Sequence, residues 1–147
     1  NNMAHSLLLA AAMTGLDVTI VSPVGYQPDP TIVQRARDIS ENTGSEVVVT
    51  DDPKAGVRDA HVVYTDVWTS MGQEAEQKAR LEAFSNFQVD LEMFELARPD
   101  AIFMHCLPAH RGEEVSAAVA DHKRSVIFDQ AENRLHAQKA LMITLLS

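Results

Sequence analysis

The hydrophobic pattern of this chain alternates between short apolar runs and longer segments with helical spacing. The short runs are rich in valine and isoleucine, which predicts strands at residues 17–22, 46–50, 61–66, 101–106 and 126–129. The longer segments repeat their apolar residues at helical intervals, which predicts helices at residues 3–14, 30–43, 52–59, 73–84, 91–97 and 131–146. In the last of these, the apolar face consists of Leu135, Leu141, Met142 and Leu145.

Strands that alternate with helices predict an α/β fold, with a doubly wound, mostly parallel sheet flanked by helices in a Rossmann-like arrangement. In such sheets, ligands bind where the strands end at the carboxyl edge. The residues that end the predicted strands are Ser22, Thr50, Asp66, Cys106 and Asp129. We therefore expect a binding site among these positions.

The start of the chain lacks the strand that normally opens such a fold. Asn1 and Asn2 lead directly into a helical pattern, and an asparagine at this point is a typical helix cap after a strand and loop. The expectation is that the chain is part of a larger protein.

Composition narrows the classes of function. The 147 residues suffice for one domain with a real core. The formal net charge of -9 and the scattered basic residues argue against nucleic-acid binding. The longest apolar run, residues 7–13, is too short to span a membrane and lacks the flanks of a signal peptide. A single cysteine excludes an internal disulfide and fits a reducing compartment, so a cytoplasmic location is expected.

The polar residues that follow the strand at 101–106 are the first chemical candidates. Cys106 could be a nucleophile, a proton acceptor or a polar wall of a cleft, or it could be a buried structural residue. His105, Cys106 and His110 could together bind zinc, but no fourth ligand is evident, so no metal is predicted. The bond between Leu107 and Pro108 could adopt the cis form at modest cost.

Two further charged residues have both a functional and an ordinary interpretation. Asp66, at the end of its strand, could bind a cationic amine or orient a base, or it could be a helix cap or turn residue. Arg134 lies in the first turn of the helix predicted at 131–146, where a bound anion would offset its poor fit to the helix dipole. It could equally pair with Asp129 or Glu132.

Common nucleotide and hydrolase signatures are absent from the sequence. There is no G-x-G-x-x-G segment, no Walker-type loop and no G-x-S-x-G elbow. No cofactor is therefore predicted.

Two motifs together resemble the ornithine carbamoyltransferase family. The first, at residues 66–74, reads Asp-Val-Trp-Thr-Ser-Met-Gly-Gln-Glu, and the second, at 105–115, reads His-Cys-Leu-Pro-Ala-His-Arg-Gly-Glu-Glu-Val. The resemblance runs from the Asn-Asn pair at 1–2 to Ala-Glu-Asn-Arg at 131–134. It implies an enzyme that transfers a carbamoyl group from carbamoyl phosphate to the δ-amine of L-ornithine, giving citrulline and phosphate.

Members of this family have two α/β domains that face each other across a cleft. The first binds carbamoyl phosphate through a Ser-x-Arg-Thr-Arg motif and a His-Pro-x-Gln motif, and neither occurs here. The resemblance implies that residues 1–147 are the ornithine-binding domain without its opening strand. It also implies an N-terminal carbamoyl-phosphate domain and a homotrimer, or a multiple of trimers, in the full protein. The isolated chain is expected to be inactive.

The resemblance also implies a role for particular residues. For ornithine, Asn2 would lie on the α-carboxylate side, Asp66 would bind the α-ammonium group, and Ser70 and Met71 would close over the amino acid. Cys106 would lie beside the reacting δ-amine and, with Asp66, would favour its deprotonated form.

The carbamoyl phosphate would be contacted from the same strand end and from the last helix. Leu107 would present its backbone carbonyl to the carbamoyl group, next to Cys106, and Arg134 would reach the carbamoyl phosphate.

Two alternatives stay open. A putrescine carbamoyltransferase is disfavoured by the Ser-Met-Gly sequence at 70–72, because putrescine has no α-carboxylate. A non-catalytic amino-acid-binding or regulatory module derived from the family would share the same motifs.

Overall fold

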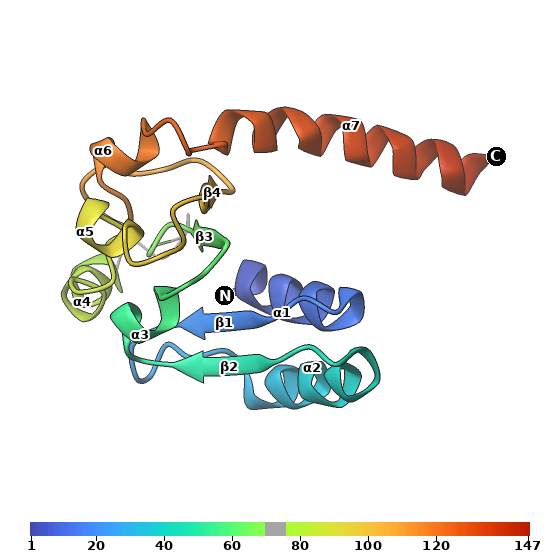
Figure 1. Cartoon of the computed structure of the whole chain (residues 1–147), viewed down its shortest axis with the longest axis horizontal. Coiled ribbons are helices and arrows are strands. Elements are labelled where there is room, and N and C mark those ends of the chain that lie inside the picture. The colour runs from blue at the N-terminus through green and yellow to red at the C-terminus, as the bar shows by residue number, and fades with distance from the viewer. Residues whose placement is uncertain (70–75) are drawn as a thin grey trace. The chain divides into compact units, whose positions relative to one another are not determined.

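The chain folds into two compact units, residues 1–58 and 59–147, each built on a pair of parallel strands (Figure 1). The computed structural model describes residues 1–69 and 76–147. The α/β class and the parallel pairing predicted from the sequence are confirmed. In the described residues, the strands form two separate two-stranded sheets, one in each unit.

The first unit alternates helices and strands in the predicted order. Its elements are α1 (Asn2–Thr14), β1 (Val18–Val21), α2 (Pro30–Thr43), β2 (Val47–Thr50) and α3 (Pro53–Val57). The Asn1 side chain caps α1 by accepting from the backbone N–H groups of Met3 and Ala4, as the sequence predicts. Gly15 ends the same helix in the left-handed conformation, with φ of 74°, which glycine adopts without steric cost.

The core of this unit lies between its two long helices and the sheet. Strands β1 and β2 pair in parallel from Val18 opposite Val47 to Val21 opposite Thr50. The buried residues of this core are Leu8 and Ala12 of α1, Val33 and Ala36 of α2, and Val47 of β2. Helix α3 approaches the sheet so closely that a Cβ atom at Gly56 would lie 2.3 Å from Cγ2 of Val21.

The second unit contains the remaining elements. They are β3 (Val62–Thr65), α4 (Gln77–Ala83), α5 (Leu91–Phe94), β4 (Ile102–His105), α6 (Ala117–Ala120) and α7 (Ile127–Leu146). The register runs from Val62 opposite Ile102 to Thr65 opposite His105. Phe94 and Phe103 are fully buried and meet edge to face, with ring centroids 6.2 Å apart, at the centre of the core.

The strand predicted at 126–129 is wrong. Phe103 forms only an isolated parallel bridge with Ser125, and the N–H of Val126 donates to the Phe103 carbonyl. Helix α7 then begins at Ile127, where the N–H of Gln130 donates to the Val126 carbonyl and closes the first turn. The apolar run is therefore divided between one bridge and the start of a helix. The short helix α6 was not predicted.

Helix α7 is mostly exposed along its length. Of its residues only Ile127 is buried. The residues predicted to form its apolar face, Leu135, Leu141, Met142 and Leu145, are 57–74% exposed.

Across the described residues, no helix is both long and apolar enough to cross a membrane.

Candidate functional site

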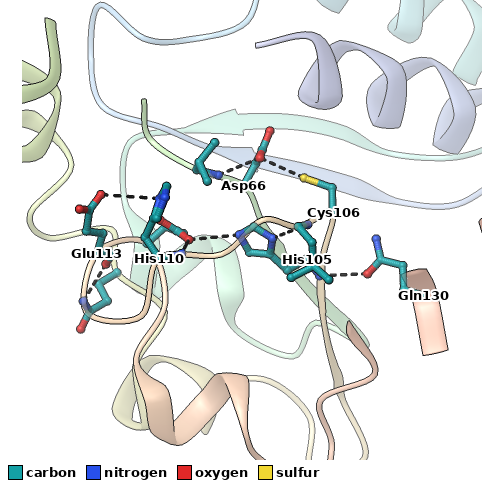
Figure 2. Close-up of polar contacts among 10 residues, drawn as sticks. Asp66, His105, Cys106, His110, Glu113 and Gln130 are labelled. Atoms are coloured by element: carbon teal, nitrogen blue, oxygen red, sulfur yellow. Dashed lines mark hydrogen bonds and ion pairs between the residues drawn. The ribbon is translucent and has the colours of Figure 1, made fainter. Parts of the chain in front are cut away.

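The carboxyl ends of β3 and β4 bring two predicted site residues into contact. Since Thr65 lies opposite His105 in the parallel register, Asp66 and Cys106 are the next residues along both strands. The Sγ atom of Cys106 donates to Oδ1 of Asp66 over 2.9 Å (Figure 2). Both side chains are partly exposed. The polar pair therefore lies at the strand edge where ligands bind in α/β folds.

Asp66 is held by its own loop as well as by the thiol. The N–H of Val67 donates to the same Oδ1 atom over 2.8 Å. Trp68 is buried two residues further on, stacks on Phe84 and has its carbonyl bonded by Arg80. The carboxylate is thus attached to an anchored segment. The predicted ornithine contacts Ser70 and Met71 lie outside the described residues.

The surroundings of Cys106 favour its neutral form. Burial and the hydrogen bond to the Asp66 carboxylate raise the pKa of the thiol to about 11. At neutral pH the sulfur therefore keeps its proton, and the S–H group donates a hydrogen bond to Asp66. This makes a thiolate nucleophile, or a thiolate that accepts a proton, unfavourable at this position.

His105 organises the turn that follows the strand. Its side chain is completely buried, and its Nδ1 atom accepts from the N–H of Leu107 over 2.8 Å. The other ring nitrogen, Nε2, lies 3.3 Å from Oε1 of Glu114, which is also fully buried. Because Nδ1 accepts, the imidazole proton is assigned to Nε2, where it faces the carboxylate.

Glu114 joins both sides of the turn, since it also accepts from the backbone N–H of His110. Burial alone would raise the pKa of this carboxyl group. The neighbouring His105 imidazole and the hydrogen bond from the His110 backbone outweigh burial, so the pKa of Glu114 is lowered and the group is ionised. A buried carboxylate of this kind fixes the loop between the strand and the next segment.

The turn held by His105 and Glu114 has an unusual backbone. The Leu107–Pro108 peptide bond is cis, the form that the sequence allowed, and Leu107 has a positive φ of 56°. Leu107 is predicted to present its carbonyl to the carbamoyl group.

Gln130, in the first turn of α7, connects the ends of both strands. Its Oε1 atom accepts from the N–H of His105 over 3.0 Å, and its Nε2 atom lies 3.4 Å from the hydroxyl of Tyr64. Sequence reasoning missed Gln130 and Glu114. The available signal for Gln130 was its position directly after an apolar run, whereas Glu114 lies in a segment rich in charge and offered none.

The zinc ligand set considered from the sequence does not assemble. Nδ1 of His105 accepts from Leu107, Nε2 faces the Glu114 carboxylate, and Cys106 is hydrogen-bonded to Asp66. Among the described residues, His110, Glu113 and Glu114 bring possible ligand atoms within 4.8 Å of one another. Since Glu114 already pairs with His105, we assign no metal to this group.

Two further predicted site residues lie on helices. Helix α7 begins at Ile127, so Arg134 lies about two turns into the helix and is exposed. The placement of Arg134 in the first turn was therefore wrong, and the helix-dipole argument for an anion does not apply. Asn2 is the first residue of α1, in the other unit. The roles of both residues stay predictions.

The fold and the cluster together define an α/β domain with ionisable groups gathered at the carboxyl end of a parallel strand pair. A family model described as the Asp/Orn binding domain of aspartate/ornithine carbamoyltransferase matches residues 1–145. The chain belongs to this family.

Individual relatives agree with that assignment. The chain is 60% identical over 146 residues to an ornithine carbamoyltransferase of Acidothermus cellulolyticus, covering 99% of this chain and 47% of that protein. It resembles the solved anabolic ornithine carbamoyltransferase of Campylobacter jejuni with a TM-score of 0.94 and 38% identity, over 99% of this chain and 48% of that one. For the Pyrococcus furiosus ornithine carbamoyltransferase the TM-score is 0.89 and the identity 50%, over 94% and 44% of the two chains. The chain thus spans about half the length of the relatives it matches.

Proposed function

We propose that this chain supplies the ornithine-binding half of an ornithine carbamoyltransferase. The enzyme would transfer the carbamoyl group of carbamoyl phosphate to the δ-amine of L-ornithine and release citrulline and phosphate. The observation that carries the proposal is the hydrogen bond between Cys106 and Asp66 at the joined ends of β3 and β4, in a chain of the carbamoyltransferase family.

The reaction needs an oriented, neutral amine rather than a covalent intermediate. The δ-nitrogen attacks the carbamoyl carbon, a carbon–nitrogen bond forms, and the bond from that carbon to the phosphate oxygen breaks. The nitrogen loses a proton in the process. A protein that holds the amine and the carbamoyl carbon at contact distance, beside a proton acceptor, supplies most of what this reaction requires.

Asp66 and Cys106 divide these tasks. The Asp66 carboxylate offers a negative charge to the ammonium group of the amino acid. Cys106, as a neutral thiol, directs its hydrogen to Asp66 and leaves sulfur lone pairs for an N–H of the incoming amine. The rigid turn of His105 and Glu114 would hold the carbonyl of Leu107 for the carbamoyl group.

The remaining assignments in this proposal follow the family resemblance. Asn2, Ser70 and Met71 complete the ornithine site, and Arg134 reaches the carbamoyl phosphate. An N-terminal carbamoyl-phosphate domain completes the enzyme, which we propose acts in the cytoplasm as a homotrimer or a multiple of trimers, without metal or cofactor.

The proposal is tested by assaying the full-length protein and the 147-residue chain with carbamoyl phosphate and a set of amines. We expect the full-length protein to form citrulline from ornithine and the chain alone to form none above the uncatalysed rate. A higher kcat/KM with putrescine would identify a putrescine carbamoyltransferase instead. Failure of the full-length protein with every amine would favour the non-catalytic module, and citrulline formation by the chain alone would contradict the proposed division of labour.

A further inference from the structure

Helix α4 contacts the loop after β3 at Trp68, the buried residue that lies two positions after Asp66. We propose that Arg80 of α4 is a positioning residue, which fixes Trp68 and thereby holds the Asp66 carboxylate in place for the amino-acid substrate. The identity of that substrate rests on the proposed function, whereas the anchoring of the loop does not.

Two residues of α4 hold Trp68, one at its backbone and one at its ring. Nη1 of Arg80 donates to the Trp68 carbonyl over 3.3 Å. Phe84, at the carboxyl end of α4, stacks on the indole with ring centroids 5.8 Å apart and an interplanar angle of 29°. Arg80 and Phe84 are four residues apart, so they lie on the same face of the helix. One face of α4 therefore holds Trp68 at two points.

The guanidinium group of Arg80 is itself oriented by Glu76, just before the helix. Nε and Nη2 of Arg80 both donate to Oε2 of Glu76, over 3.1 and 2.9 Å, while Nη1 is directed at Trp68. The Glu76 side chain is 61% exposed, so the ion pair adds little energy. Its contribution is direction, because a planar guanidinium holds two partners at fixed angles, whereas a lysine ammonium is a point charge on a flexible stem.

Asp66 lies between two fixed points of the backbone. On one side, Thr65 ends the paired register of β3 with β4, and on the other side Trp68 is held by α4. The N–H of Val67, between these points, donates to Oδ1 of Asp66 over 2.8 Å. If the bond from Arg80 were lost, the carbonyl of a buried residue would lose this donor, and the segment would shift to recover one. The shift would displace the carboxylate that we propose binds the ammonium group.

The charge of Arg80 by itself leads to the opposite expectation. Ornithine carries a net positive charge in neutral solution, because its two amines are protonated and it has one carboxylate. Removal of a cation from the protein would therefore strengthen its electrostatic attraction for ornithine. Weaker binding to an Arg80 variant would report a displaced contact rather than a lost charge.

The test is the steady-state rate of citrulline formation by the full-length protein at saturating carbamoyl phosphate. Arg80→Met should lower kcat/KM for ornithine about tenfold, chiefly by raising KM, because one hydrogen bond from a charged donor is lost. Lys78→Met, an exposed change on the same helix, removes the same charge and should leave both parameters unchanged. Glu76→Gln should change kcat/KM less than about twofold.

A combination of Arg80→Met with Asp66→Asn tests whether Arg80 acts through the carboxylate. If it does, Arg80→Met should lower kcat/KM less than about twofold in the Asp66→Asn background. Equal losses in both backgrounds, or a wild-type KM in Arg80→Met alone, would overturn the proposal. Should circular dichroism show that Arg80→Met does not fold, Phe84→Leu weakens the same anchor at the ring. It should raise KM about threefold, and a wild-type KM there would overturn the proposal as well.

Hydrogen exchange measures the anchoring without any substrate. In the full-length protein, the peptide that contains Val67 and Trp68 should exchange faster in Arg80→Met than in Lys78→Met, since the N–H of Val67 is bonded within the anchored loop. Equal exchange in the two variants would overturn the anchoring. If the full-length protein forms no citrulline at all, the proposed function fails, and the exchange rates still decide whether Arg80 holds the loop.

Discussion

The two parallel strand pairs of this chain end in different ways. At the end of β1 and β2, the polar side chains bond locally or not at all: Thr50 Oγ1 accepts from the nearby N–H of Asp52, and the buried hydroxyl of Ser22 has no hydrogen-bond partner in the described structure. At the end of β3 and β4, side chains bond to partners on other elements. Cys106 donates to Asp66, 40 residues away in sequence, and His105 donates to Gln130.

This difference separates an edge that turns the chain from the edge at which we propose the chemistry takes place. Local bonds around Thr50 and Asp52 cap a short helix, a task that any parallel strand requires of its loop. The bonds around Cys106 order side chains from two strands and a helix, which holds reactive groups at a fixed spacing. The proposed site therefore lies at the strand ends whose side chains are joined to one another.

The largest effect on this comparison should come from breaking the buried pair beneath the site. Glu114→Ala removes the partner of His105 and of the His110 backbone, so we expect the free energy of unfolding of the full-length protein to fall by about 3 kcal/mol or more. Urea denaturation measures this loss. Glu113→Ala, its partly exposed neighbour, is the control and should cost much less.

The same pair predicts how stability depends on pH. The pKa of Glu114 is lowered from the ordinary value of 4.5 in the folded protein, so its contribution is present above that value and is lost as pH falls through the folded pKa. The stability difference between wild type and Glu114→Gln should therefore shrink on acidification. A difference that is constant with pH would mean that the carboxylate charge does not contribute.

The next effect concerns the charge at the end of β3. Asp66→Asn in the full-length enzyme should weaken ornithine binding by about 1.5–3 kcal/mol, because a charge-assisted contact to an ammonium group is lost. Carbamoyl phosphate binding should be nearly intact, and calorimetric titration with each ligand measures both. Equal losses for the two ligands would make Asp66 a structural residue.

A smaller effect is expected at the end of β4. Cys106→Ser should lower kcat about tenfold, weaken ornithine binding, and leave the circular dichroism spectrum unchanged, since serine keeps a donor but alters size and polarity. Because the thiol pKa is about 11, the rise of activity with pH on the acidic side should keep its midpoint. A shifted midpoint would show that the thiol takes up the proton, and near-normal turnover would return Cys106 to a structural role.

The smallest effect should come from the other strand pair. Ser22→Ala removes a buried hydroxyl that has no partner in the described residues, so the free energy of unfolding should change by less than about 0.5 kcal/mol. Thermal unfolding of the full-length protein checks this. A loss of activity in this variant would show that the end of β1 also takes part in the site.

Much of the fold could be predicted from the sequence because its signals are local. Runs such as residues 47–50 and 102–105 are apolar, rich in residues that favour strands or flanked by turn signals, and they form strands as expected. The run at 126–129 failed because a short apolar segment suits a strand and a helix start equally well. The error then moved Arg134 to the wrong turn of α7.

The site was predictable only in part. Asp66 and Cys106 end strands, so their contact follows from parallel pairing. Gln130 and Glu114 could not be found in this way, because their partners are set by how α7 and the loop after β4 pack, and no periodic pattern encodes that packing.

Because Gln130 lies in α7, the hydrogen bonds at the ends of β3 and β4 depend on the position of this helix along its axis. A helix advances about 1.5 Å per residue, so sliding α7 by a single residue would carry Gln130 out of reach of both His105 and Tyr64. The exposed remainder of the helix is therefore joined to the carboxyl ends of β3 and β4 through one amide side chain. A contact that displaced α7 along its axis would break the bond to the backbone N–H that directly precedes Cys106.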